Sequence, residues 1–123
     1  MGPLSFELMY HVAGVVLAAG SNVVLETHFY RGTSEPKIEG LAARHGARLV
    51  QLFCEVPLEE LRRRHAKRVA SGARPHIDQP FDHAKLPQSA CWTPLALTAP
   101  LRRVDTTVSP NVPDLTRWVQ AQD

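Results

Sequence analysis

Short apolar runs that end in an acid constrain this chain more than any other feature. The stretch Asn22 to Gly32 reads Asn-Val-Val-Leu-Glu-Thr-His-Phe-Tyr-Arg-Gly, so its apolar part ends at Glu26. The run from Ala47 to Glu55 ends in the same way, and Leu101 to Asp105, a short third predicted strand, also ends in an acid. Such runs are typical of buried parallel strands. Because ligands bind at the carboxyl edge of open α/β sheets, Glu26 is either a functional acid or the first residue of an ordinary loop.

Helices are predicted between these strands. Apolar residues three and four apart, with caps and glycines at the ends, mark the predicted helices: Leu4 to Ala19, Thr33 or Ser34 to about His45, a helix with Pro57 in its first turn, and Asp114 to Gln120. From Ser71 to Pro94 the pattern is irregular, and we expect at most a short helix around Phe81 to Lys85. The alternation predicts one α/β domain over residues 1–123, with a mostly parallel sheet.

Composition excludes several classes of protein. With 44% hydrophobic and 21% charged residues, the 123-residue chain is globular and not disordered. A net charge of +2 is too small to indicate a nucleic-acid partner, although six of the fourteen Lys and Arg residues lie between Arg62 and Arg74. The apolar run Val12 to Ala19 is too short to span a bilayer. Because Cys54 and Cys91 do not have the spacing of a zinc knuckle or a redox pair, we expect a soluble, reduced, cytoplasmic protein.

Four motifs together carry a resemblance to a known family. They are Val-Val-Leu-Glu-Thr-His-Phe-Tyr-Arg-Gly at 23–32, Leu-Val-Gln-Leu-Phe-Cys-Glu-Val-Pro-Leu-Glu-Glu-Leu-Arg-Arg-Arg at 49–64, Ala-Ser-Gly-Ala-Arg-Pro-His at 70–76, and Leu-Arg-Arg-Val-Asp-Thr-Thr at 101–107. In this order they resemble the C-terminal two thirds of a P-loop small-molecule kinase. The similarity is to the AAA-type ATP-binding kinases related to zeta toxins and to chloramphenicol and shikimate kinases.

The resemblance implies a partial three-layer α/β/α fold of the P-loop NTPase type. It also implies Mg-ATP as cofactor and a small-molecule hydroxyl as phosphoacceptor. The sequence contains no Gly-x-x-x-x-Gly-Lys-Ser/Thr motif, so the first strand and the phosphate-binding loop of the family are absent from these residues. In the family that strand lies between the strands ending at Glu26 and Glu55. We therefore expect re-pairing of the two strands, a homodimer through exposed edges, or a partner that supplies the strand.

By the same resemblance, Glu26 and the residues after it form a site for the phosphoacceptor. Glu26 would hold Mg²⁺ through water or activate the acceptor hydroxyl, and no residue is expected to bind the metal directly. The substrate-binding residues of this loop would be Thr27, His28, Tyr30 and Arg31. His28 is either a base near neutral pH or an ordinary surface residue.

The resemblance makes residues 62–94 a lid over the nucleotide. Arg68 and Arg74 would act in catalysis and Arg64 in nucleotide binding, since a guanidinium matches phosphate oxygens. The alternative is a solvated helix in which acids of the first turn pair with arginines one turn later. Asp105 and Thr106 correspond to the end of the last family strand, whose loop usually contacts the adenine.

Two functions remain open. The first is a fragment of an ATP-dependent small-molecule kinase, inactive or in need of a missing N-terminal segment. The second is a non-catalytic, self-associating α/β module that binds a phosphorylated ligand through its arginines. Nucleic-acid binding is disfavoured because the arginines are interleaved with acids and lack aromatic partners. His76, His83 and Cys91 lack zinc spacing, and Trp92 and Trp118 are expected to pack and not to stack on a base.

Overall fold

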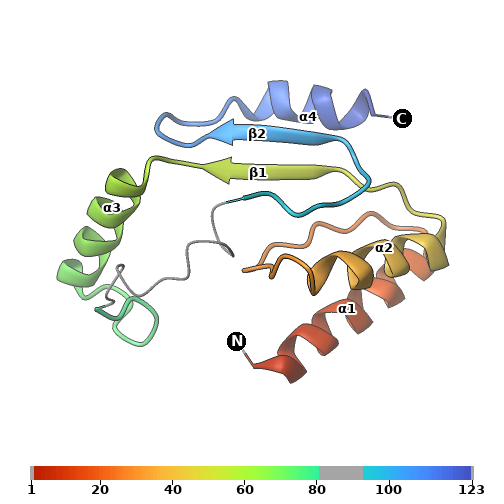
Figure 1. Ribbon diagram of the computed structural model, residues 1–123, viewed down its shortest axis with the longest axis horizontal. Helices are drawn as coiled ribbons and strands as arrows, with labels where there is room; N and C mark the ends of the chain where they lie inside the picture. The colour runs from red at the N-terminus through yellow and green to blue at the C-terminus, as the bar shows by residue number, and fades with distance from the viewer. Residues whose placement is uncertain (1, 81–92, 123) are drawn as a thin grey trace.

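A computed structural model describes residues 2–80 and 93–122. The order of elements is helix, helix, strand, helix, strand, helix: α1 (Pro3–Ala18), α2 (Ser34–His45), β1 (Gln51–Glu55), α3 (Leu58–Ser71), β2 (Leu101–Asp105) and α4 (Val112–Gln120) (Figure 1). All four predicted helices between residues 3 and 120 are therefore present. The short helix predicted at 81–85 lies outside the described residues, as do His83, Cys91 and Trp92.

Glycines end the first three helices as the sequence predicts. Gly20 follows α1 with φ +79°, and the next residue, Ser21, donates its N–H to the Val16 carbonyl oxygen at 3.2 Å. Gly46 and Gly72 close α2 and α3 with φ of 60° and 61°. Glycine is favoured there because a Cβ makes the left-handed conformation costly.

The buried core lies between α1 and α2, which run side by side in Figure 1. Four of its members are Tyr10 and Ala13 from α1, and Ile38 and Leu41 from α2. Burying a large apolar side chain contributes about 1.5–3 kcal/mol, so this helix pair supplies much of the hydrophobic stabilisation. The apolar residues of the segment that follows α1 pack against the same core: Val23, Leu25 and Phe29.

β1 and β2 form a two-stranded parallel sheet in the described part of the chain. The register pairs Gln51 with Leu101 and Glu55 with Asp105. α4 follows β2 and lies beside it, where Asp114 pairs with Arg102, and the Arg102 guanidinium stands 5.8 Å from the Trp118 ring centroid. The predicted partial α/β fold with a parallel sheet is thus confirmed.

The predicted strand at Val23 to Glu26 was wrong. Residues 23–30 have side chains that are alternately half-buried and exposed, with a bend at Thr27, but no ladder joins them to a described strand. A strand requires a hydrogen-bonded neighbour, and in the described residues none lies between this segment and β1. The expected direct re-pairing with β1 was therefore wrong for the described part of the chain, whereas dimerisation stays a prediction. The strand predicted from Ala47 starts only at Gln51 for the same reason.

In the described ranges, no helix has both the length and the apolar composition needed to cross a membrane.

Candidate functional site

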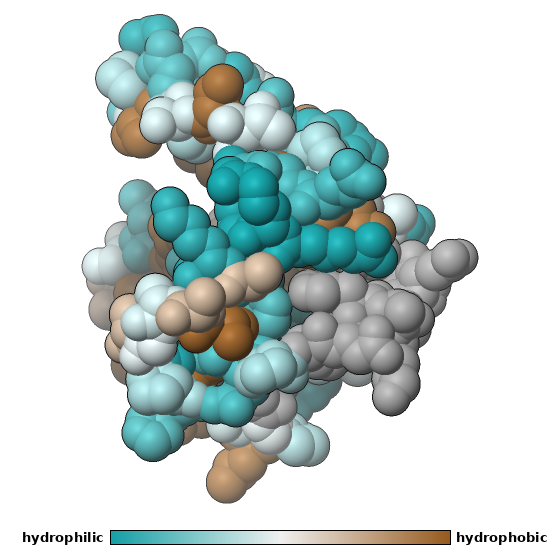
Figure 2. Space-filling view, turned by 90° about the vertical axis from the view of Figure 1, so that its left-hand side faces the viewer, coloured by the Kyte–Doolittle hydropathy of each residue, from teal (hydrophilic) through white to brown (hydrophobic). Residues whose placement is uncertain are grey.

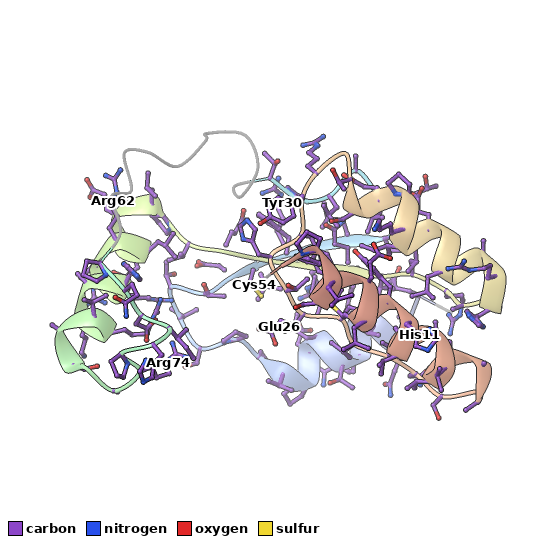
Figure 3. The ribbon with its side chains drawn as sticks, turned by 90° about the horizontal axis from the view of Figure 1, so that it is seen from below. His11, Glu26, Tyr30, Cys54, Arg62 and Arg74 are labelled. Atoms are coloured by element: carbon purple, nitrogen blue, oxygen red, sulfur yellow. The ribbon has the colours of Figure 1, made fainter. Side chains whose placement is uncertain are left out.

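A cavity of about 440 Å³ separates the segment after α1 from β1. One wall consists of residues 23–29 apart from Val24, the other of residues 47–54, and Ile38 and Leu41 of the core also line it. Glu26 and Cys54, labelled in Figure 3, both lie in the middle of the molecule. The structure therefore brings three predicted site residues to one cavity: Glu26, Thr27 and His28.

The loop that follows Glu26 is folded back on the start of α2. The Tyr30 carbonyl oxygen accepts hydrogen bonds from the N–H groups of Thr33 at 3.1 Å and Ser34 at 2.8 Å. The Tyr30 N–H in turn donates to the Ser34 Oγ at 2.9 Å. Gly32 takes φ +85°, a conformation that glycine permits. We call residues 26–32 the acceptor loop, and these bonds fix its end, residues 30–32.

Glu35 is a buried acid at this loop that sequence reasoning missed. Its side chain accepts a hydrogen bond from the Gly32 N–H at 2.6 Å and another from the Ala96 N–H at 3.1 Å. Burial acts to raise the pKa of the Glu35 carboxyl, but hydrogen bonds from backbone N–H groups and the charge of Arg31 outweigh it and lower the pKa. The signal was an acid in the first turn of a helix, which reaches back to free N–H groups.

The helix cap differs from the sequence prediction in detail. Thr33 occupies the N-cap of α2 without a side-chain cap bond, and the Ser34 hydroxyl accepts from the Tyr30 N–H. The Glu35 carboxylate, and not the Thr33 side chain, accepts a hydrogen bond from a free backbone N–H, that of Gly32. A carboxylate suits this place because helix N-termini favour negative charge.

Tyr30 and Arg31 make contacts away from Glu26. The Tyr30 ring centroid lies 5.1 Å from that of His28 and 5.9 Å from that of Phe6. Arg31 donates from Nη1 to the Thr93 Oγ1 at 3.1 Å, and Thr93 is one of the cavity-lining residues. All four predicted substrate-binding residues thus stand on one short loop, two of them lining the cavity directly.

Arg68 and Arg74 share a carboxylate that the sequence did not single out. Asp78 accepts from the Arg68 Nε at 3.3 Å and from the Arg74 Nε at 3.0 Å, and its side chain is only 8% exposed. Burial acts to raise the pKa of Asp78, but hydrogen bonds from Arg74 and Arg68 outweigh it, so the pKa is lowered. The two predicted catalytic arginines therefore share one negative charge within their own segment.

Arg64, Asp105 and Thr106 come together at the ends of β1 and β2. Arg64 donates from Nη2 to the Thr106 carbonyl oxygen at 2.7 Å, and Thr106 donates from its N–H to the Glu55 carbonyl oxygen at 2.9 Å. The Asp105 carboxylate accepts a hydrogen bond from the N–H of Thr107 at 2.8 Å. Hydrogen bonds from Thr107 lower the pKa of Asp105. The predicted nucleotide-binding residues are neighbours, joined here by contacts among themselves.

The first turns of α3 show the ion pairs expected of a solvated helix. Glu60 accepts from the Nε of Arg63 and from the Nε of Arg64, each at 2.7 Å. Hydrogen bonds from Arg63 and then Arg64 lower the pKa of Glu60 to about 2. Hydrophilic residues cover much of the side of the molecule seen in Figure 2, the side on which α3 lies in Figure 1.

The acceptor loop and the arginines of α3 are separate in space. In Figure 3, Arg62 and Arg74 lie at the α3 end of the molecule, well away from Glu26. We call Arg64, Arg68 and Arg74 the arginine cluster. The structure therefore presents the predicted residues as two groups, one along the cavity and one on and beyond α3.

Comparisons with known proteins agree with this arrangement of elements. No curated protein matches the sequence. The structure is similar to the crystal structure of a putative kinase from Chloroflexus aurantiacus j-10-fl, with a TM-score of 0.77 and 22% sequence identity. The similarity covers 98% of this chain and 68% of that chain, and at this identity it concerns the fold. The AAA domain family matches residues 3–86, more than half of the chain. The chain therefore belongs to the AAA domain family and has its P-loop kinase-like fold.

Proposed function

We propose that residues 1–123 supply the acceptor loop and the arginine-bearing helix of an ATP-dependent small-molecule kinase. The observation that carries this proposal is that Glu26, Thr27 and His28 line one wall of a cavity of about 440 Å³. Cavities of this volume hold small molecules. The membership in a family of P-loop kinase-like domains supports phosphoryl transfer as the reaction class.

In this proposal Glu26 acts on the hydroxyl of the acceptor. An exposed carboxylate at the cavity wall is free to accept the hydroxyl proton as the oxygen attacks a phosphoryl group. Thr27 and His28 contribute hydrogen-bonding groups to the same wall, and Arg31 holds the loop to Thr93. The identity of the acceptor then depends on the other cavity-lining side chains, most of which are apolar.

The described residues do not fit Mg-ATP by themselves. No three His, Cys, Asp or Glu side chains in the described part of the chain are grouped so that they could hold a metal ion. The sequence has no Gly-x-x-x-x-Gly-Lys-Ser/Thr loop to cradle phosphates. We therefore propose that the phosphate-binding loop comes from outside these residues and that the 123 residues alone are inactive.

The arginine cluster has to change partners to act on phosphates. Arg68 and Arg74 now bind Asp78, and Arg64 binds Glu60 and the Thr106 carbonyl oxygen. A phosphate would have to compete with these groups, since each guanidinium offers a limited set of donors. This competition also weakens the alternative of a phosphate-binding module that works through the same arginines.

A hybrid protein tests the proposal. A strand followed by a Gly-x-x-x-x-Gly-Lys-Ser loop is joined ahead of residue 1, and ADP formation from Mg-ATP is measured across a panel of small hydroxyl compounds. We expect turnover with at least one compound, and a loss of about 10²- to 10⁴-fold in Glu26→Gln, the usual contribution of a general base.

Glu59→Gln is the matched control for this experiment. Glu59 is an exposed carboxylate in the first turn of α3 and does not line the cavity, so its removal changes the net charge equally. A hybrid in which Glu26→Gln and Glu59→Gln turn over as fast as the unchanged protein would exclude Glu26 from the reaction.

A further inference from the structure

α1 is apolar on two faces, and its contact with α2 buries one of them. Tyr10 and Ala13 lie in the core against α2. On the opposite side of α1, a row of side chains is between 51% and 82% exposed: Leu4, Leu8, Val12 and Val15. Residues three and four apart are neighbours on a helix, so these four form one continuous stripe. Because a helix with apolar residues all round is normally buried, the stripe is a candidate contact surface.

A groove of about 320 Å³ lies beside the stripe, along the C-terminal half of α1. Four of the residues that line it from α1 stand at positions i, i+3, i+4 and i+7: His11, Gly14, Val15 and Ala18. The residues that line it from α2 are Leu41, Arg44 and His45. Gly14 and Ala18 leave the groove open because they have little or no side chain. Four residues at this spacing form the hole that accepts one side chain from a facing helix.

The two halves of α1 are complementary in shape. Leu4 and Leu8 are exposed on the N-terminal half, whereas the groove lies on the C-terminal half. In an antiparallel pair of α1 helices, Leu4 of each copy meets the groove of the other at the partner's Val15. A parallel pair would set groove against groove and leave both unfilled. The antiparallel contact uses the same patch on both copies, as in a twofold-symmetric dimer.

The charges beside the stripe suit a second copy of the chain and not a lipid surface. Glu7 lies on the side of α1 that faces α2, where it pairs with Lys37. In the antiparallel pair Glu7 would lie beside the partner's His11, so that an acid meets a base. α1 contains no Lys or Arg. Helices that lie on membranes are instead rich in these residues on their polar face.

We propose that this face of α1 is a self-association surface, on which a second copy of the chain packs antiparallel with Leu4 of each copy in the groove of the other. α1 lies at the outer edge of the molecule in Figure 1, and Figure 3 looks onto it, with His11 labelled. Leu4, Leu8 and Val12 do not line the cavity at Glu26, so the surface is separate from the proposed acceptor site. A contact made mainly by one helix from each copy is small, and we expect a dissociation constant between about 1 µM and 1 mM.

Sedimentation equilibrium of the 123-residue chain and of Leu4→Ala tests the proposal. We expect dimers of the unchanged chain, and a dissociation constant about tenfold or more higher in Leu4→Ala, since a side chain seated in a pocket carries much of the binding energy. Leu58→Ala is the matched control and should dimerise as the unchanged chain does. Leu58 is 40% exposed and follows Pro57 in the first turn of α3, as Leu4 follows Pro3 in α1. Circular dichroism shows whether both variants are folded.

Methyl contacts measured by nuclear magnetic resonance identify the surface directly. Leu4 and Val15 are about 16 Å apart along one helix, so a contact between their methyl groups can only join two antiparallel copies. We expect this contact at high protein concentration and its loss on dilution.

Four results would overturn the proposal. A chain that is still monomeric at about 1 mM has no such surface. A dimer as tight in Leu4→Ala as in Leu58→Ala, or one without the contact between Leu4 and Val15, associates elsewhere, for example through the edge of β1. Contacts of Leu8 or Val12 with residues 81–92 in dilute protein would mean that this segment covers the face.

Discussion

The acceptor loop and the arginine cluster carry the predicted site residues, but they are held in different ways. In the acceptor loop, a buried acid, Glu35, fixes the backbone through the N–H groups of Gly32 and Ala96. In the arginine cluster, long side chains that are about half exposed pair with Asp78, which is itself nearly buried. The first arrangement anchors the end of the loop, whereas in the second two arginines share one negative charge.

This difference separates the two sides of the proposed reaction. The bond between the Gly32 N–H and a buried carboxylate preorganises the end of the acceptor loop. Guanidinium groups bound to a carboxylate are occupied, so a phosphate gains only the difference between two similar interactions. The proposed acceptor side therefore has a cavity and an anchored loop in this structure, whereas the arginines of the proposed phosphate side are paired with carboxylates.

Removal of the buried acid should give the largest effect. Glu35→Ala leaves the Gly32 and Ala96 N–H groups without their acceptor, and we expect the free energy of unfolding to fall by about 1–3 kcal/mol. Urea denaturation followed by circular dichroism measures the change. Glu39→Ala is the control, because Glu39 is less buried and accepts one backbone bond, from the Thr98 N–H at 2.9 Å. A loss for Glu39→Ala equal to that of Glu35→Ala would show that Glu35 is not the special anchor of the loop.

A smaller effect is expected from the release of the two paired arginines. In Asp78→Asn, the negative charge that Arg68 and Arg74 share is gone, so inorganic pyrophosphate should bind several-fold more tightly than to the unchanged chain. Glu59→Gln also removes one negative charge, in the first turn of α3, but it leaves Asp78 paired with Arg68 and Arg74. Titration monitored by nuclear magnetic resonance compares the two. If the affinity for pyrophosphate rises equally in both variants, net charge and not the release of Arg68 and Arg74 determines it.

The acid dependence of stability should be the smallest effect. The pKa is lowered in the folded chain for Glu35, Asp78 and Glu60, the last to about 2. A lowered pKa means that the stabilisation is present above the unfolded value, 4.5 for a glutamate, and is lost as pH falls towards the folded value. The urea midpoint should therefore fall mainly between pH 4.5 and about 2.

Two variants show how much the acceptor loop and α3 each contribute to this decline of the urea midpoint. Glu35→Gln should flatten it more than Glu60→Gln, since the pairs of Glu60 are at the surface and screened by salt. A larger flattening in Glu60→Gln would reverse the comparison between the loop and α3.

The sequence was sufficient wherever a local signal decided the structure. Gly46 and Gly72 ended helices as predicted, and Leu101–Asp105 formed the predicted strand because β1 lies beside it. Val23 to Glu26 has an equally good pattern for a strand. It forms none, because pairing depends on a neighbour and a local pattern carries no information about one.

The candidate site was predicted in part for the same reason. Glu26 could be selected as a site residue from the sequence, because it directly follows an apolar run. Glu35 and Asp78 were missed because their roles depend on partners that are distant in sequence or beyond a helix end, Ala96 and Arg68. Arg64 was chosen for its charge, yet its contact with the Thr106 carbonyl oxygen requires the fold to bring α3 to the end of β2.

Calorimetric titration of Mg-ATP into the 123-residue chain, with Arg68→Ala beside it, tests the central claim most directly. The claim is that the proposed acceptor side has a cavity and an anchored loop, whereas the arginines of the proposed phosphate side are paired with carboxylates. We therefore expect neither protein to bind the nucleotide more tightly than about 1 mM, which corresponds to about 4 kcal/mol. Micromolar binding by the unchanged chain that is lost in Arg68→Ala would contradict the account, because the arginine cluster would then hold phosphates without a phosphate-binding loop.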